Sequence, residues 1–340
     1  MQNKAWNKLL EFETRDLVER FIKNKHNRDS TARQVLEITS NFIQAREYFK
    51  NSQRAEITVK PLLQYYGVAS LARGLILSCS PKISESSMKP SHGLDTLNWR
   101  EALVKKDFGS LTVTIKQGTF YELLTSTGNK TYLKHNSSGV NWSLDFPLPK
   151  IGTQITLIDL VQTISDFSDE FETWTQRKLH FLTIQSLKHS SQGEGYEFVV
   201  NKPIDSSTIA EILSEEIYGP YSITENGGKT TISTKTNHIP QFSQRFTDPF
   251  NIGIGDISLT RPINNNLYLN VLSQYYLLSF FLGMLSRYFP STWISLGRTE
   301  KGDSVYPLFI KIIDAIDKYF PLLIVEYLGG PYNFEKKEIA

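Results

Sequence analysis

Residues 61–80 read PLLQYYGVASLARGLILSCS, a run of twenty residues with a single charge, at Arg73. The run predicts a helix with apolar side chains on nearly every side, and such a helix must lie at the centre of a bundle. Pro61 fits the first turn, where a backbone N–H is not needed. This segment decides the fold because other helices have to surround it.

A second run of the same kind lies near the other end of the chain, at 267–288. No charge falls between Arg261 and Arg287, and residues 274–276 repeat the QYY of residues 64–66. Polar residues such as Asn270 and Gln274 interrupt it, so its apolar stretches are shorter than the roughly 20 residues that a membrane span needs. We therefore expect a second core helix and no membrane contact.

The flanking segments also predict helices. In residues 31–56 the apolar positions recur at intervals of three and four, which gives one buried face, and Thr31 offers an N-cap. Residues 306–328 predict a C-terminal helix that Pro321 divides.

The middle of the chain is rich in β-formers. Residues 108–146 alternate with period two and predict strands, including residues 118–121. Residues 153–174 predict a helix, and residues 177–236 predict a small α+β unit with a hairpin at Asn226-Gly227-Gly228. Residues 237–266 hold three prolines and are expected to be irregular.

These patterns together predict an α+β fold whose helical core is built from the N- and C-terminal segments, with a β-rich α+β region inserted. The expected parts are a helical segment at 1–104, the β-rich insertion at 105–245, a C-terminal helical part at 246–330 that packs on the first, and a tail at 331–340. A series of independent domains is the alternative.

Composition limits the function. The formal net charge of +2 gives no strong field for nucleic acid or anionic lipid. The single cysteine, Cys79, excludes internal disulfides and a cysteine-based zinc site. The charged N-terminus has no apolar segment of signal-peptide length, so a cytoplasmic protein is expected. The sequence has no P-loop and no HExxH motif, so neither a cofactor nor a metal is expected.

Two residues are candidates for chemistry. Arg73 lies on an apolar helix and needs an anion or carbonyl partner, because an unpaired buried charge is costly. A buried ion pair is one interpretation of Arg73, and a phosphate contact is another. His92 precedes Gly93 after a Ser- and Pro-rich loop, which is typical of a turn histidine and also of an acid–base group.

Aromatic and arginine side chains offer a second kind of site. Tyrosine, tryptophan and arginine are the usual anchors of protein interfaces. Core packing is the other interpretation of the same aromatic residues. The candidate binding residues are Tyr65, Tyr66, Arg73, His92, Arg287 and Trp293.

The order of Tyr65-Tyr66, the stretch LARGLIL at 71–77, a loop and His92-Gly93-Leu94 resembles the bacterial YaaC-like family. The resemblance extends over most of the chain, including residues 118–120 and 319–321, and it implies no particular activity. Residues 30–100 also resemble HEPN domains, which implies a helical bundle that self-associates or binds a partner.

We therefore expect a non-enzymatic interaction or assembly component of a bacterial multi-protein system, such as antiphage defence, with a protein partner or a second copy of the chain. The alternative is a divergent HEPN-type ribonuclease or a nucleic-acid-binding module. In that case Arg73 and His92 would meet, because an arginine and a histidine can stabilise and protonate a phosphodiester during cleavage.

Overall fold

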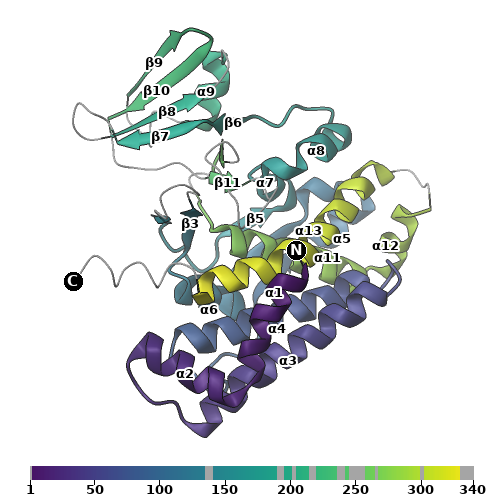
Figure 1. The fold of residues 1–340 in the computed structure, drawn as a ribbon. Helices are drawn as coiled ribbons and strands as arrows, with labels where there is room; N and C mark the ends of the chain where they lie inside the picture. The colour runs from purple at the N-terminus through teal and green to yellow at the C-terminus, as the bar shows by residue number, and fades with distance from the viewer. Residues whose placement is uncertain are drawn as a thin grey trace. The chain divides into compact units, whose positions relative to one another are not determined.

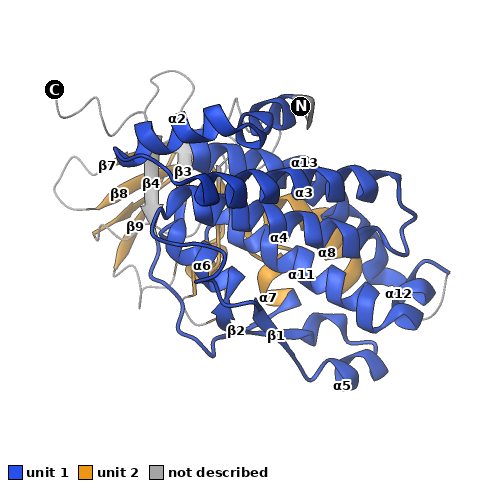
Figure 2. Ribbon diagram, turned by 90° about the horizontal axis from the view of Figure 1, so that it is seen from below, with its two compact units in different colours: residues 1–130, 145–157, 270–340 blue, residues 131–144, 158–269 orange. Residues whose placement is uncertain are grey.

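The computed structural model describes residues 2–134, 141–189, 195–200, 204–213, 220–235, 242–244, 257–264, 267–298 and 302–329 (Figure 1). The fold is α+β, with helices at both ends of the chain and short strands between them, which confirms the predicted class. The chain divides into two compact units, residues 1–130, 145–157 and 270–340, and residues 131–144 and 158–269 (Figure 2). The expected tail at 331–340 lies outside the described residues, and the expected domain boundaries stay a prediction.

The first unit holds the terminal helices and one small sheet. Its helices are α1 (Gln2–Leu9), α2 (Arg15–His26), α3 (Ala32–Arg54), α4 (Lys60–Cys79), α5 (Trp99–Val104), α6 (Thr119–Ser126), α11 (Val271–Tyr288), α12 (Pro290–Leu296) and α13 (Tyr306–Gly329). Its sheet has the order β1-β2-β5, formed by β1 (His92–Leu97), β2 (Thr112–Gly118) and β5 (Gln154–Thr156), with antiparallel neighbours.

Helix α4 is the centre of this unit, as its sequence predicts. It packs against α3 and α6 from the N-terminal part of the chain and against α11 and α13 from the C-terminal part (Figure 2). A Cβ at Gly67 would lie 2.7 Å from the Phe49 ring, and one at Gly74 would lie 2.7 Å from the Phe42 ring. The two glycines therefore let α3 approach α4 closely with its phenylalanine rings between them.

A buried polar contact joins α4 to α13. Gln64 Nε2 donates to Asp317 Oδ1 and to the Ile313 carbonyl, each at 2.8 Å, and Lys60 Nζ lies 3.1 Å from Asp317 Oδ2. Burial raises the pKa of the Asp317 carboxyl, while Gln64 and Lys60 oppose the shift. The contact fixes the first turns of α4 against a helix some 250 residues later in the chain.

The structure corrects several predictions of secondary structure. Residues 119–126 form helix α6 rather than a strand, because Phe120, Leu123 and Leu124 enter the core at helical spacing and override their local β-propensity. The expected helix at 153–174 begins with strand β5. Helix α13 runs through Pro321 without a break, with buried Phe320 and Leu322 on either side of the proline.

The second unit has short strands and helices. They are β4 (Asn141–Asp145), paired with β3 (Lys130–Lys134), then α7 (Leu157–Val161), α8 (Ser168–Thr175), β6 (Phe181–Ile184), β7 (Ser186–His189), β8 (Tyr196–Val200), α9 (Ser206–Ile212), β9 (Tyr221–Asn226), β10 (Lys229–Thr234), β11 (Phe242–Gln244) and β12 (Ile257–Thr260).

Two sheets organise this unit, in the orders β7-β8-β10-β9 and β11-β12-β6. The predicted hairpin is present, since β9 and β10 pair around Gly227 and Gly228. Helix α9 starts at Ser206. Strands β11 and β12 lie inside the segment expected to be irregular. None of the helices in the described part of the chain has the length and apolar character that a membrane crossing needs.

Candidate functional site

A tyrosine–histidine pair lies at the contact between α4 and the start of β1. The Tyr65 hydroxyl lies 2.7 Å from His92 Nδ1. The Tyr65 side chain is buried and the His92 side chain is half-buried. The rings of both residues contact Phe280 of α11, with centroids 5.6 Å and 6.0 Å apart. The pair therefore joins residues from three distant parts of the chain.

Two glycines hold His92 in this position. Gly93 has φ +76° and Gly118 has φ +143°, both in the region that favours glycine. A Cβ on Gly118 would lie 2.6 Å from the Gly93 nitrogen, so the backbones of β1 and β2 touch here. The register of the two strands shifts between His92 and Leu94. This bulge places the imidazole beside Tyr65, whereas the sequence predicted a turn histidine or an acid–base group without naming its partner.

Burial keeps the pair neutral. Burial lowers the pKa of the His92 ring, and the nearby charge of Arg287 lowers it further. Burial also raises the pKa of the Tyr65 hydroxyl, and the neighbouring hydroxyl of Tyr276 adds to this shift. Tyr65 keeps its proton and His92 stays uncharged. We assign the phenol O–H as the donor to Nδ1, because a phenol donates more strongly than it accepts, and this assignment places the ring proton on Nε2.

An aromatic and cationic surface lies beside this pair. Arg287 Nη1 donates to the Tyr66 hydroxyl at 2.7 Å, and the Arg287 guanidinium lies 5.0 Å from the centre of the Tyr288 ring. Tyr48 stacks on Tyr66 with centroids 5.5 Å apart. Arg287 and Tyr288 are exposed, and Tyr48 and Tyr66 are half-buried. We call these four residues the Tyr66–Arg287 surface.

Arg73 has a different partner. Its Nη2 lies 3.7 Å from Glu85 Oε1, in the loop that follows α4. Glu85 Oε1 also accepts a hydrogen bond from Asn41 Nδ2 at 2.8 Å. Arg73 thus forms a partly exposed ion pair, and no hydrogen bond or ion pair between Arg73 and His92 is recorded in the described part of the chain.

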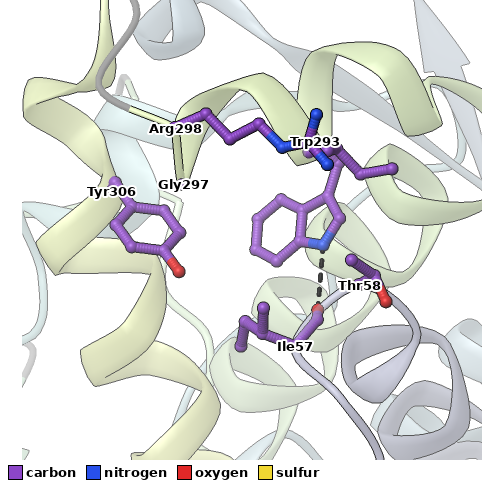
Figure 3. A pocket seen from close by; sticks show the side chains of 7 residues that line it. Ile57, Thr58, Trp293, Gly297, Arg298 and Tyr306 are labelled. Atoms are coloured by element: carbon purple, nitrogen blue, oxygen red, sulfur yellow. Dashed lines mark hydrogen bonds between the residues drawn. The ribbon is translucent and has the colours of Figure 1, made fainter.

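Trp293 lines a small pocket at the end of α12 (Figure 3). The indole Nε1 donates to the Ile57 carbonyl at 3.0 Å, and the rings of Trp293 and Tyr306 lie 6.5 Å apart. The pocket has a volume of about 140 Å³. Its lining residues are Ile57, Thr58, Trp293, Ile294, Gly297, Arg298 and Tyr306. The Trp293 side chain is buried, so it shapes the pocket wall more than the outer surface.

The residues that the structure describes offer no set of ligands for a metal ion. No group of three or more His, Cys, Asp or Glu side chains gathers there in a way that could hold a metal ion. Burial raises the pKa of the Cys79 thiol, which keeps it protonated and less nucleophilic.

The comparisons with known proteins agree with the resemblance seen in the sequence. The model of the family described as YaaC-like protein matches residues 10–328. The chain belongs to the YaaC-like family. The searches of curated proteins and of solved structures gave no match. The resemblance of residues 30–100 to HEPN domains stays a prediction.

The YaaC-like chain brings four of its six candidate residues together. Tyr65 is bound to His92 and Tyr66 to Arg287, and the rings of Tyr65 and Tyr66 lie 5.8 Å apart, whereas Arg73 and Trp293 have other partners. Sequence reasoning missed Tyr48 and Glu85. No local pattern marks these two residues, because Tyr48 meets Tyr66 only through the packing of α3 on α4 and Glu85 meets Arg73 only through the course of a loop.

Proposed function

We propose that this YaaC-like protein is a non-enzymatic interaction or assembly component of a bacterial multi-protein system, and that the Tyr66–Arg287 surface contacts its protein partner or a second copy of the chain. The observation that carries the proposal is the composition of that surface. Tyrosine and arginine dominate the energetic hot spots of protein interfaces. Here two exposed anchors, Arg287 and Tyr288, stand on rigid helix positions beside a buried tyrosine–histidine pair.

The rigid support favours binding over chemistry. A surface whose side chains are already ordered loses less conformational entropy on association. Arg287 is held by the Tyr66 hydroxyl, and Tyr66 is held by the Tyr48 ring. A role in antiphage defence rests on the family resemblance and on no single residue. A cytoplasmic location is part of the same proposal.

Light scattering across a concentration series, together with pull-down from cells that express a tagged chain, tests the proposal. We expect a mass above the 38.9 kDa of one chain or a stoichiometric partner. Tyr288→Ala should weaken that association about tenfold or more. Val104→Ala is the control, because Val104 is an exposed apolar residue outside this surface. A chain that stays monomeric and retains no partner would sink the proposal.

The alternative proposal is a divergent HEPN-type ribonuclease or a nucleic-acid-binding module that uses Arg73 and His92. Its support is weaker, because Arg73 is paired with Glu85 and His92 with Tyr65. Incubation of the purified protein with RNA, beside Arg73→Ala and His92→Ala variants, tests it. If the wild-type protein cleaves or binds RNA and each of the two substitutions abolishes this activity, the result favours the alternative over the interaction role.

A further inference from the structure

The Tyr66–Arg287 surface carries hydrogen-bond donors without matching acceptors. A guanidinium has five N–H groups, and the one recorded acceptor for Arg287 is the Tyr66 hydroxyl. Within the described ranges, no carboxylate lies at ion-pair distance from Arg287. The exposed cation therefore presents further N–H groups toward solvent.

Tyr66 adds a second donor. Its hydroxyl oxygen accepts the proton of Arg287 Nη1, so its own O–H group is left to donate elsewhere. The Tyr48 ring stacks on the Tyr66 ring and restricts its rotation. The donor pair of Arg287 and Tyr66 is thus held in one geometry before any ligand arrives.

His92 supplies a third donor next to them. Its Nδ1 is bound to the Tyr65 hydroxyl, and the tautomer assigned above carries the ring proton on Nε2. The charge of Arg287 lowers the pKa of the His92 ring, so the two groups interact electrostatically. The rings of Tyr65 and Tyr66 lie 5.8 Å apart, so the Arg287–Tyr66 hydrogen bond and the Tyr65–His92 hydrogen bond are neighbours on α4.

We propose that Arg287, Tyr66 and His92 form an oxyanion site that binds one carboxylate from an acidic segment of the partner protein. The inference rests on the proposed interaction function and names the chemistry of the partner. Arginine binds a carboxylate through two parallel N–H bonds, and a hydroxyl donor beside it adds a third. The exposed Tyr288 ring and the half-buried rings of Tyr48 and Tyr66 would cover the apolar part of the bound side chain.

Charge favours a carboxylate over a phosphate. Phosphate recognition relies on clusters of arginines, because a phosphate monoester carries close to two negative charges. Nucleic-acid binding needs lysines and arginines interleaved with aromatic rings. On the Tyr66–Arg287 surface one cation stands among three tyrosines, which matches a single negative charge.

Acetate and inorganic phosphate are the probes that test this site in the intact protein. The signals of ¹³C-labelled histidine and tyrosine rings are followed by NMR during titration, with chloride at equal ionic strength as the reference. We expect acetate to shift the His92 and Tyr66 signals saturably. Arg287→Gln and Tyr66→Phe should each weaken acetate binding, the first by about tenfold or more, which corresponds to a lost charge-assisted hydrogen bond.

Arg54→Gln is the matched control, because Arg54 is also an exposed arginine in the last turn of a helix. It should leave acetate binding unchanged. Equal acetate shifts in the wild type and in Arg287→Gln would overturn the proposal, as would phosphate binding tenfold tighter than acetate. Tyr66→Phe keeps the ring stack, so it tests the site even if Arg287→Gln fails to fold.

The two proposals fail in different ways. If acetate binds as expected but the chain neither self-associates nor retains a partner, the oxyanion site stands and the interaction function does not. If association is present but survives Arg287→Gln at full strength and acetate causes no shift, the interaction function stands and the oxyanion site does not.

Discussion

The hydrogen bond between Tyr65 and His92 sets the electrostatics of the whole site. It buries a titratable ring beside a cation and two tyrosines, and burial holds that ring in its neutral form. His26 is partly buried as well, and desolvation lowers the pKa of its ring. Its Nε2 lies 2.8 Å from the Ser78 carbonyl oxygen. Both histidines bind fewer protons when the chain is folded than when it is unfolded.

This difference predicts how stability depends on pH. With a folded pKa below the unfolded value of about 6.5, each histidine contributes stability that is present above pH 6.5 and is lost as pH falls toward its folded pKa. We expect the free energy of unfolding to fall between about pH 7 and pH 5.

Urea unfolding at several pH values checks this, with His92→Gln and His26→Gln as variants. Each should reduce the slope of stability against pH, and the double variant should reduce it by the sum, because the two histidines have different hydrogen-bond partners. A slope that His92→Gln leaves untouched would mean that the ring is not buried as described.

At the scale of elements, the close approach of α4 and α11 is the decisive contact. Gly283 of α11 faces Tyr65 of α4, and a Cβ added there would lie 2.7 Å from Tyr65 Cβ and 3.0 Å from Cγ. Tyr65 is fully buried and its hydroxyl is bound to His92, so it has little room to move. The glycine thus couples the packing of the two core helices to the position of the site.

Gly283→Ala should therefore destabilise the protein. Alanine is favoured over glycine in a helix by about 1 kcal/mol, but forcing a methyl group into a packed core costs about 1–3 kcal/mol. We expect a net loss of up to about 2 kcal/mol in the free energy of unfolding, measured in urea. Gly329→Ala is the control, because an added Cβ there meets no atom within 4 Å. A gain of about 1 kcal/mol in Gly283→Ala would show that helix propensity outweighs the clash.

The sequence alone predicted which segments form the core helices, but not which residues of these helices contact one another. The apolar runs at 61–80 and 267–288 were sufficient to identify α4 and α11, because few polar residues interrupt them. The eight residues of α6 were mistaken for a strand, since Thr, Phe and Tyr are also common in sheets. The candidate site was predictable to the same extent: its residues could be named, but their partners could not. Tyr65, Tyr66, His92 and Arg287 were each recognised by residue type, whereas their pairings depend on packing between segments up to 221 residues apart.

At the scale of the whole molecule, segments from both the N-terminal and the C-terminal part of the chain build the core of the first unit. Helices α3 and α4 come from the N-terminal part, and α11 and α13 from the C-terminal part (Figure 2). The polar contact of Gln64 and Lys60 with Asp317 and the hydrogen bond between Arg287 and Tyr66 both join these parts. The unit and its candidate site therefore cannot form until residues beyond 270 are in place.

Native-state hydrogen exchange tests this central claim most directly. Amides of α4 and α11 should be the slowest to exchange and should share one free energy of opening, which Gly283→Ala lowers by the same amount in both helices. If α11 opened at a distinctly lower free energy while α4 stayed protected, the two chain ends would not form one core.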